Sequence, residues 1–323
     1  MRAFAPASVS NVGPGFDTFG FAVEGMGDLV AARTSSIPGA RLLEITGDDG
    51  SLPREAAKNT AGIAASQVLD RIAALDGRDK ANGEDGVGVE LRLEKGMPLA
   101  SGLGSSAASA VAAAVAVNAA LGGHLSQETL LHCAIEGERI ACGAAHGDNA
   151  APSLYGGFVL VRGKGTPRID PLPVPEGLSC AILRPHVAVQ TGAARALLGD
   201  HIPLANAITQ WGHAAALVAG LFSGDYELIS SAIHDVVAEP VRREWVPGFE
   251  AIQRAALESG ALGCSLSGSG PSLFGLCRSQ EEAQNTLAAM QQALGSATDL
   301  RGDGFVSVVG AQGARVLAAG EKP

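Results

Sequence analysis

Residues 98–109 form a loop rich in glycine and serine, PLASGLGSSAAS, which leads directly into an alanine-rich segment. Glycines let backbone N–H groups approach an anion, and a helix N-terminus adds unpaired donors and the positive end of its macrodipole. The loop therefore predicts a phosphate-binding site. Ser105 and Ser106 are also good N-caps, so a well-capped buried helix is the alternative. The pattern GxxxxGK[ST] does not occur and no lysine follows Gly104, which disfavours a P-loop kinase.

The chemistry expected of Glu138 depends on a helix predicted over residues 126–143. Its neighbours at i−7, i−4, i−3, i+3 and i+4 are apolar, so the carboxylate projects from the apolar face. A buried carboxylate without a partner costs several kcal/mol. A divalent cation held between Glu138 and a serine of the loop would supply that partner and would neutralise bound phosphates. An internal salt bridge to Arg139 or another arginine is the alternative.

Three further segments place Asn, Asp, His or Ser side chains in turns rich in glycine. They are SNVGPGFD at residues 10–17, HGDN at residues 146–149 and SLSGSGP at residues 265–271. Asx residues in such loops form turns more often than they bind ligands. Each segment alone is therefore only a weak sign of a site.

The composition limits the partners and the location of the chain. Of 323 residues, 46% are hydrophobic and 17% are charged, and 23 Lys and Arg against 33 Asp and Glu give a net charge of −10. Such a chain is not expected to bind nucleic acid or an anionic membrane, and a negatively charged substrate would need local cationic groups. No apolar segment reaches the roughly 20 residues of a membrane span, and no signal peptide is expected. Five cysteines without a CxxC pair predict reduced thiols and a cytoplasmic location.

Helices and strands must position these segments. Hydrophobic periodicity predicts helices over residues 59–75, 126–143, 204–221, 249–259 and 280–294, besides the alanine-rich helix after the loop. It predicts strands over residues 29–32, 42–46, 87–93, 157–161, 179–183, 264–266, 273–276 and 305–309. These elements do not alternate regularly as βαβ units, which favours an α+β fold. A polar segment rich in Gly and Pro at residues 162–177 predicts two domains, residues 1–165 and 166–323.

Together the motifs resemble one family, the GHMP kinases (galacto-, homoserine, mevalonate and phosphomevalonate kinases). Residues 98–109 match the central phosphate-loop motif, residues 5–17 the N-terminal motif and residues 265–271 the C-terminal motif. Within this group the chain is similar to the homoserine kinases, through APASVSNVGPGFD at 5–17, HGDNAAPSLYGG at 146–157, TGAAR at 191–195 and EPVRREWVPG at 239–248. It departs from them at Val12, Gly147, Gly192 and Ser269, where Leu, Pro, Lys and Ala are common. None of these departures removes a residue that the chemistry needs.

The resemblance implies a two-domain GHMP kinase fold, with a domain similar to the second domain of ribosomal protein S5 followed by a ferredoxin-like domain. It also implies a homodimer. ATP would lie in the cleft, bound by Asn59 near the adenine and by Pro98, Leu99, Ala100, Ser101, Gly102, Leu103, Gly104, Ser105, Ser106 and Ser109. The implied ligands of Mg²⁺ are Ser106 and Glu138, and the implied catalytic residues are Asp148, Asn149 and Ser106. The implied substrate pocket contains Asn11, Asp17, His146, Asp148, Asn149, Arg195 and Arg242.

The activity that the resemblance implies is ATP-dependent phosphorylation of the hydroxyl of L-homoserine, a step of threonine biosynthesis. Arg195 and Arg242 could form planar forks on the α-carboxylate of this substrate, while Asp17 could accept its ammonium group. Asn149 and Asp148 would orient the hydroxyl. Phosphoryl transfer through a loose transition state needs mainly alignment and charge neutralisation. A strong general base is therefore not required, and Asp148 is the candidate if one acts.

Two other functions are compatible with the same fold. A GHMP kinase could act on another small alcohol, such as mevalonate or a sugar, but a neutral sugar would leave both guanidinium groups unpaired. A non-catalytic sensor could bind ATP and a ligand without turnover. Loss of the metal ligand or of the loop glycines would be its signature, whereas Glu138, Ser106, Gly102 and Gly104 are all present.

Overall fold

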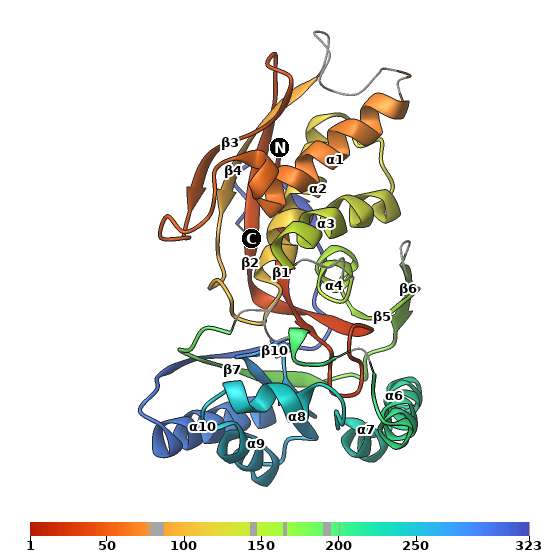
Figure 1. Ribbon diagram of the computed structural model, residues 1–323, viewed down its shortest axis with the longest axis vertical. Helices are drawn as coiled ribbons and strands as arrows, with labels where there is room; N and C mark the ends of the chain where they lie inside the picture. Colours follow the sequence, from red (N-terminus) through yellow and green to blue (C-terminus); the bar gives the residue numbers. More distant parts are fainter. Residues whose placement is uncertain are drawn as a thin grey trace.

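A computed structural model describes residues 1–75, 77, 87–142, 147–163, 167–189, 195–199 and 201–322 of the chain. Figure 1 shows two layered halves stacked along the long axis of the molecule. One half contains a seven-stranded sheet covered by α1 to α4, and the other contains a four-stranded sheet with α6 to α10. Residues 76 and 78–86, between the predicted helix 59–75 and the predicted strand 87–93, lie outside the described residues, as does His146.

The seven-stranded sheet is built around the long strand β2. Its order is β11-β1-β2-β4-β3, and β5 pairs with β2 and with β6. All pairings are antiparallel except the parallel pair β3 and β4. The strands are β1 (Arg2–Ser10), β2 (Phe19–Ser35), β3 (Gly39–Thr46), β4 (Gly88–Glu94), β5 (Phe158–Arg162), β6 (Arg168–Leu172) and β11 (Arg315–Leu317).

The helices of this half are α1 (Thr60–Leu75), α2 (Ser105–Ala120), α3 (Gln127–Cys142) and α4 (Ala150–Tyr155), with a 3₁₀ turn at Ala56–Lys58. The alanine-rich helix α2 packs between β1 and β2 on one side and α1 and α3 on the other. Twelve of its 16 residues are buried, as expected for a helix that is apolar on every face. Because α2 is fixed in this way, the loop before its N-terminus has a fixed position too.

The four-stranded sheet is antiparallel, with the order β10-β7-β9-β8. Its strands are β7 (Ser179–Pro185), β8 (Gly263–Leu266), β9 (Leu273–Cys277) and β10 (Gly302–Val308). The helices of this half are α6 (Leu204–Ser223), α7 (Tyr226–Ala232), α8 (Glu239–Arg242), α9 (Phe249–Glu258) and α10 (Gln280–Ala297), with a 3₁₀ turn at Arg243–Trp245. Helix α10 packs on the sheet and against α9, while α6 packs against α7.

A continuous core joins the two halves. Phe21 of β2 lies 5.6 Å from Phe158 of β5 and 6.2 Å from Phe274 of β9, measured between ring centroids. The chain also returns from the second half to the first, because β11 follows β10 in sequence but pairs with β1 in the seven-stranded sheet. The domain limits 1–165 and 166–323 stay a prediction.

The predicted α+β fold is confirmed, and each predicted helix and strand corresponds to one in the structure within a few residues, although β2 is far longer than predicted. No described helix is long and apolar enough to cross a membrane. Four cysteines among the described residues, Cys133, Cys180, Cys264 and Cys277, are buried free thiols.

Candidate active site

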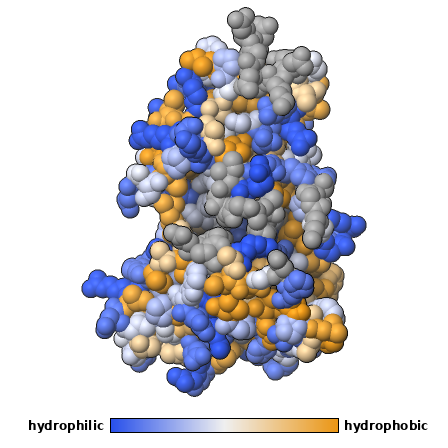
Figure 2. All heavy atoms as spheres, viewed as in Figure 1, coloured by the Kyte–Doolittle hydropathy of each residue, from blue (hydrophilic) through white to orange (hydrophobic). Residues whose placement is uncertain are grey.

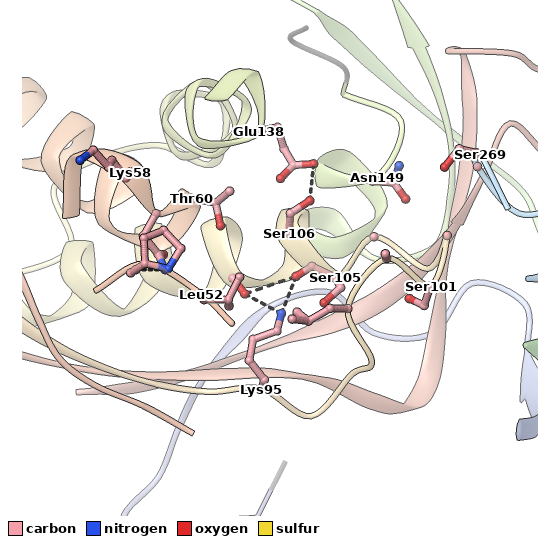
Figure 3. A pocket seen from close by; sticks show the side chains of 18 residues that line it. Leu52, Lys58, Thr60, Lys95, Ser101, Ser105, Ser106, Glu138, Asn149 and Ser269 are labelled. Carbon is pink, nitrogen blue, oxygen red and sulfur yellow. Dashed lines mark hydrogen bonds between the residues drawn. The ribbon is translucent and has the colours of Figure 1, made fainter. Parts of the chain in front are cut away.

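The phosphate loop borders a cavity of about 370 Å³, which is within the usual size range of small-molecule sites. Figure 3 shows side chains from both halves of the molecule around it. The lining residues are Leu52, Pro53, Lys58, Asn59, Thr60, Lys95, Leu99, Ala100, Ser101, Gly102, Gly104, Ser105, Ser106, Ser109, Glu138, Asn149, Gly268 and Ser269. The structure therefore brings residues of three separate segments, the phosphate loop, HGDN and the C-terminal motif, to one place.

Two glycines of the loop have a conformation and surroundings that other residues would not fit. Gly102 has φ +77°, and a Cβ there would lie 2.6 Å from the carbonyl oxygen of Ser267. Gly104 has φ +69°, and a Cβ there would lie 2.3 Å from the hydroxyl of Ser8. Glycine is thus required for the path of the loop as well as for close approach of a phosphate.

Hydrogen bonds from the segment between β8 and β9 hold the phosphate loop in place. The hydroxyl of Ser267 donates to the carbonyl oxygen of Gly102 at 2.7 Å, and the hydroxyl of Ser272 donates to that of Ser101 at 2.6 Å. The loop between β8 and β9 is therefore a clamp on the phosphate loop across the boundary between the two halves.

The N-terminus of α2 opens towards the cavity without a side-chain cap. Gly104 occupies the cap position and provides no side-chain hydrogen bond to the first turn. The hydroxyl of Ser105 is buried without a hydrogen-bond partner among the described residues, and that of Ser106 is directed to Glu138. The capped-helix alternative is not what the structure shows, and the free N–H groups remain available for an anion.

Glu138 lies on α3, opposite the first turn of α2. It is buried, and its Oε2 accepts a hydrogen bond of 3.0 Å from Ser106, while Oε1 has no partner in the described part of the chain. Burial raises the pKa of the Glu138 carboxyl to about 7, and the charge of Asp148 adds to the rise, whereas the Ser106 hydrogen bond and the charge of Lys95 oppose it. Arg139 is not its partner, because it pairs with Glu136 at 2.9 Å.

Ser106 and Glu138 fit the requirements of Mg²⁺. The ion prefers oxygen ligands, and it is usually bound by one or two carboxylates together with water and substrate phosphates. The unpaired Oε1 of Glu138 offers one such oxygen and the Ser106 hydroxyl a second. The described residues contain no group of three or more His, Cys, Asp and Glu side chains that could hold a metal ion, so phosphate and water would have to complete the coordination.

Asp148 and Asn149 lie just before α4, next to the first motif. Asn149 accepts a hydrogen bond of 2.9 Å from Ser8 and donates one of 3.0 Å to the hydroxyl of Ser10. Asp148 is buried. Burial raises the pKa of its carboxyl to about 7 and the charge of Asp17 adds to the rise, while a hydrogen bond with Ser10 opposes it.

Two arginines meet over the ring of Phe16. The guanidinium carbon of Arg195 is 5.4 Å from the ring centroid and that of Arg242 is 5.1 Å from it. Arg195 forms a bidentate pair with Asp17, at 2.7 and 3.1 Å, and this pairing raises the pKa of Arg195. Arg242 is buried, donates to the carbonyl oxygen of Gly268 at 3.0 Å, and has a buried Nε without a partner among the described atoms. Burial lowers the pKa of Arg242.

Asn11 connects the first motif with the third. Its side chain donates to the carbonyl oxygen of Gly268 at 2.8 Å and accepts from the backbone N–H of Asp17 at 3.1 Å. Asn11 and Asp17 both have positive φ, 70° and 58°, which Asn and Asp tolerate better than most residues. The structure therefore gives Asn11 a role in holding Asp17 beside the arginines.

The residues predicted from the sequence are mostly brought together. Asn59 lines the cavity, and its side chain donates to the carbonyl oxygen of Pro53 and accepts from the N–H of Ala61 at the start of α1. Pro98 and Leu103 are not among the lining residues, and the Leu103 side chain belongs to the core. The roles predicted for these residues stay predictions.

The cavity also contains residues that were not predicted. Leu52, Pro53, Lys58 and Thr60 are neighbours of Asn59 in sequence and line the cavity too, and Figure 3 shows Lys95 beside the first turn of α2. The sequence did carry a signal for Lys95, since this lysine stands between a predicted strand and the phosphate loop.

Comparisons with known proteins bear on the family of the chain. Residues 65–157 match the model of the GHMP kinases N terminal domain, and residues 216–296 match the GHMP kinases C terminal model. A homoserine kinase of Chlorobium phaeobacteroides is 44% identical over 323 residues, covering 98% of this chain and 99% of the relative. A homoserine kinase of Xylella fastidiosa is 38% identical and covers 98% and 94% of the two chains.

Solved structures of homoserine kinase and mevalonate kinase are also similar to this chain. The crystal structure of homoserine kinase from Cytophaga hutchinsonii has a TM-score of 0.90 and 47% identity, covering 98% of this chain and 97% of that chain. The structure of L. major mevalonate kinase in complex with R-mevalonate has a TM-score of 0.69 at 16% identity and covers 96% of both chains, which supports the fold alone. The chain belongs to the GHMP kinases and, within them, to the homoserine kinases.

Proposed function

We propose that this protein transfers the γ-phosphoryl group of ATP to the hydroxyl of L-homoserine, giving O-phospho-L-homoserine and ADP in threonine biosynthesis. The observation that carries the proposal is the placement of Arg195, Arg242 and Asp17 around Phe16, next to the cavity of the phosphate loop. An amino acid presents an α-carboxylate and an α-ammonium group, and this cluster offers a partner to each.

ATP would lie along the cavity with its phosphates on the loop and on the N-terminus of α2. Its adenine would lie beside Asn59 and the apolar pair Leu52 and Pro53, which also line the cavity. Ser106 and Glu138 would hold Mg²⁺. When bound, this ion would neutralise charge on the phosphate oxygens during transfer.

Binding of L-homoserine would break the ion pair between Asp17 and Arg195, and each of the two residues would then bind the substrate. Its ammonium group would take the place of Arg195 at Asp17, and its carboxylate would bind Arg195 and Arg242. Arg242 gains most from this exchange, because its buried guanidinium has a carbonyl oxygen but no carboxylate as a hydrogen-bond partner in the described residues. Charge-assisted, bidentate bonds of this kind are strong and directional.

The transfer itself forms a bond between the homoserine oxygen and the γ-phosphorus and breaks the bond from that phosphorus to the bridging oxygen of ADP. Asn149 lies between the loop and the first motif, where it can orient the hydroxyl. Asp148 is beside it, and the pKa of Asp148, raised to about 7 by burial, is suited to accepting the hydroxyl proton late in the step. Most of the rate enhancement is assigned to alignment and electrostatics.

The other functions are less well supported. A neutral sugar would leave Arg195 and Arg242 without an anion, and mevalonate would leave Asp17 without an ammonium group. A sensor without turnover does not require the Ser106 and Glu138 pair that the cavity retains.

The test is ADP release with ATP and Mg²⁺ and a panel of four acceptors: L-homoserine, mevalonate, galactose and shikimate. L-Homoserine is expected to give by far the highest kcat/KM. Equal or better turnover of mevalonate would overturn the substrate, while the assignment to the GHMP kinases would stand. ATP binding without turnover of any acceptor would favour the sensor.

We also propose a cytoplasmic location and a homodimer. Four described cysteines are buried free thiols, as is usual for proteins of a reducing compartment. The dimer would form through α6, a helix of 20 residues that contains no Asp, Glu, Lys or Arg. One stripe of this helix carries large exposed apolar side chains.

A further inference from the structure

A buried ion pair lies beneath the phosphate loop, apart from the metal ligands and the substrate arginines. It joins Lys95, at the end of β4, to Asp28 in β2, and their side chains are 1% and 0% exposed. We propose that Lys95 is a positioning residue for the nucleotide phosphates: it fixes the first turn of α2 and directs the positive end of a buried ion pair at the phosphate site. This inference rests on the proposed function, because it requires a nucleotide in the cavity.

The hydrogen bonds of Lys95 connect the sheet to the first turn of α2. Its ammonium group donates to a carboxylate oxygen of Asp28, to the carbonyl oxygen of Ser105 at 2.8 Å and to the hydroxyl of Ser109 at 2.8 Å. Ser109 in turn donates to Asp28 at 2.6 Å. An ammonium group has three donors, so all three are used within the protein. Lys95 therefore acts on a phosphate through its charge and through the helix, and not as a direct ligand.

The ion pair is oriented with respect to the cavity. Lys95 is a lining residue and Asp28 is not. One carboxylate oxygen of Asp28 accepts a hydrogen bond of 3.0 Å from the backbone N–H of Gly96, and the other accepts from Lys95 and Ser109, so both oxygens have partners within the protein. The positive end of the pair faces the space where the phosphates would lie, and the negative end faces away from it.

Stability alone gives a poor account of this arrangement. A cation near a helix N-terminus is unfavourable because of the macrodipole, and a buried ion pair is often no more stabilising than apolar residues of similar volume. A bound polyphosphate would make the position of Lys95 favourable, since it places anionic charge next to the helix N-terminus and the lysine.

Among the described lining residues, Lys95 is a buried cation. The second cationic residue among them is Lys58, whose side chain is 68% exposed and paired with Glu55. In a chain of net charge −10, a site for ATP needs such a local positive group. The charge of Lys95 further opposes the rise in the pKa of Glu138, which helps to keep that carboxylate ionised for a cation.

The experiment separates the charge of Lys95 from its contribution to folding. Lys95→Met alone leaves Asp28 buried without its cation and should lower the melting temperature strongly. The double variant Lys95→Met/Asp28→Asn removes both charges, keeps the acceptor for Gly96 and leaves the net charge unchanged. Lys95→Gln/Asp28→Asn is a second neutral pair, for use if the first does not fold. Each folded variant is titrated calorimetrically with ADP, ATP and adenosine, with and without Mg²⁺.

We expect a neutral pair to recover most of the melting temperature but to bind ADP and ATP about tenfold more weakly than the parent, because the field of the ion pair is lost. Adenosine affinity should be unchanged, since it has no phosphate. In turnover, the KM for ATP should rise and the KM for L-homoserine should not. Lys322→Met, near the C-terminus, removes one lysine outside the site and should leave all three affinities as they are.

Two results would overturn the inference: a neutral pair with restored stability that binds ADP as tightly as the parent, or an equal loss for adenosine and ADP. The first would make Lys95 a structural residue only, and the second would mean that it shapes the nucleoside end of the site. Failure of both neutral pairs to fold would also overturn it, since the pair would then be needed for folding. If the parent itself bound neither ADP nor ATP, the proposed function would fail first.

Discussion

The carboxyl group of Glu138, the proposed ligand of Mg²⁺, opposes folding when it is ionised. It is buried and has one oxygen without a partner in the described structure, so its ionised form is unfavourable until a cation binds. Because its pKa is raised from 4.5 to about 7 in the folded protein, the folded state binds this proton more tightly than the unfolded state. The contribution of the group to stability is therefore full below pH 4.5 and is lost as pH rises through about 7.

The substitution Glu138→Gln should therefore change stability and activity in opposite directions. At about pH 8 without Mg²⁺ the variant should melt at a higher temperature than the parent, and it should lack the part of the pH dependence that arises between 4.5 and about 7. Its kcat should fall about 100-fold or more, because the charge proposed to hold Mg²⁺ is lost. Melting curves across this pH range and assays across a range of Mg²⁺ concentrations measure both effects.

Glu136→Gln is the matched control for this change. Glu136 lies on the same helix, but its side chain is 40% exposed and pairs with Arg139, so its removal should leave kcat and the pH dependence nearly unchanged. Near-parental activity of Glu138→Gln at limiting Mg²⁺ would show that Glu138 is a structural residue.

The arginines allow a second prediction for single residues. Arg242→Ala or Arg195→Ala should lower kcat/KM for L-homoserine by roughly 2–4 kcal/mol, since each removes a charged, bidentate partner of the carboxylate. The KM for ATP should change little. An amino alcohol without the carboxylate should be a poor substrate of the parent, and neither substitution should weaken its turnover much further. Steady-state kinetics with both substrates measure the difference.

Arg243→Ala is the control, because Arg243 is adjacent in sequence yet 44% exposed, and its contact with Glu250 is 3.8 Å long. Exposed ion pairs contribute at most about 1 kcal/mol. If Arg242→Ala lost the same factor with the amino alcohol as with L-homoserine, the arginine would act on the phosphates or on the fold, and the carboxylate site would have to be abandoned.

At the scale of elements, the segment between β8 and β9 contacts the phosphate loop at Gly102, which explains why the loop needs glycine there. Gly102→Ala combines a positive φ with a Cβ 2.6 Å from the carbonyl oxygen of Ser267. It should displace the loop, lower the melting temperature and weaken ATP binding by at least about tenfold, as thermal melts and calorimetric titration would measure. Gly123→Ala is the control, since Gly123 has φ +75° but an alanine methyl group there would meet nothing within 4 Å. Equal effects of the two substitutions would mean that backbone strain, and not the clamp, makes Gly102 necessary.

Local sequence patterns predicted the long helices and most strands, but they did not predict the short helices α4, α7 and α8 or the strands β1, β6 and β11. The strand β1 has the sequence RAFAPASVS, with several residues of low β propensity. It becomes a strand because β2 and β11 pair with it on its two sides. The strand β11 is separated from β1 by nearly the whole chain, so its pairing cannot be inferred from a local pattern.

The parts of the candidate site that lie within one continuous motif were predicted from the sequence, whereas contacts between distant segments were not. The loop, Ser106 and Glu138 meet as expected, because the loop leads into one helix and the apolar face of α3 directs Glu138 towards it. The pairing of Arg195 with Asp17 was not expected, since both were predicted to contact the substrate. That bond depends on charges 178 residues apart in the chain. Lys95 was missed for a similar reason, because its partner Asp28 is on another strand.

At the scale of the whole molecule, the cavity beside the phosphate loop lies where the two halves meet, with lining residues from both. Figure 2 shows apolar side chains gathered on the lower part of one face, the half that Figure 1 shows to contain α6 to α10. On α6, Leu204, Ile208, Trp211 and Phe222 are 70%, 53%, 58% and 67% exposed. Their spacing places them on one stripe of the helix.

The area of this stripe supports a second copy of the chain as its partner. A large aromatic side chain buries roughly 150–250 Å², so two aromatic and two aliphatic side chains at these exposures offer on the order of 400 Å² per protomer. A standard interface buries about 800 Å² per partner, so two stripes packed about a twofold axis would form its apolar centre. Because a twofold contact uses the same surface on both copies, the lack of charge along α6 avoids repulsion between them.

Ile208→Glu should therefore convert the dimer into a monomer, because two buried carboxylates would face each other across the axis. Sedimentation equilibrium at micromolar to tens of micromolar chain measures the association constant, which should fall at least about 100-fold. Leu257→Glu is the matched control, since Leu257 is an exposed apolar residue on α9, 46% exposed, and its substitution should leave the association constant unchanged. A parent protein that is monomeric over this range, or an Ile208→Glu variant that remains dimeric, would rule out α6 as the interface. Because both glutamates replace exposed side chains, each variant should keep the parental melting temperature of the monomer, so a change in association can be separated from a loss of folding.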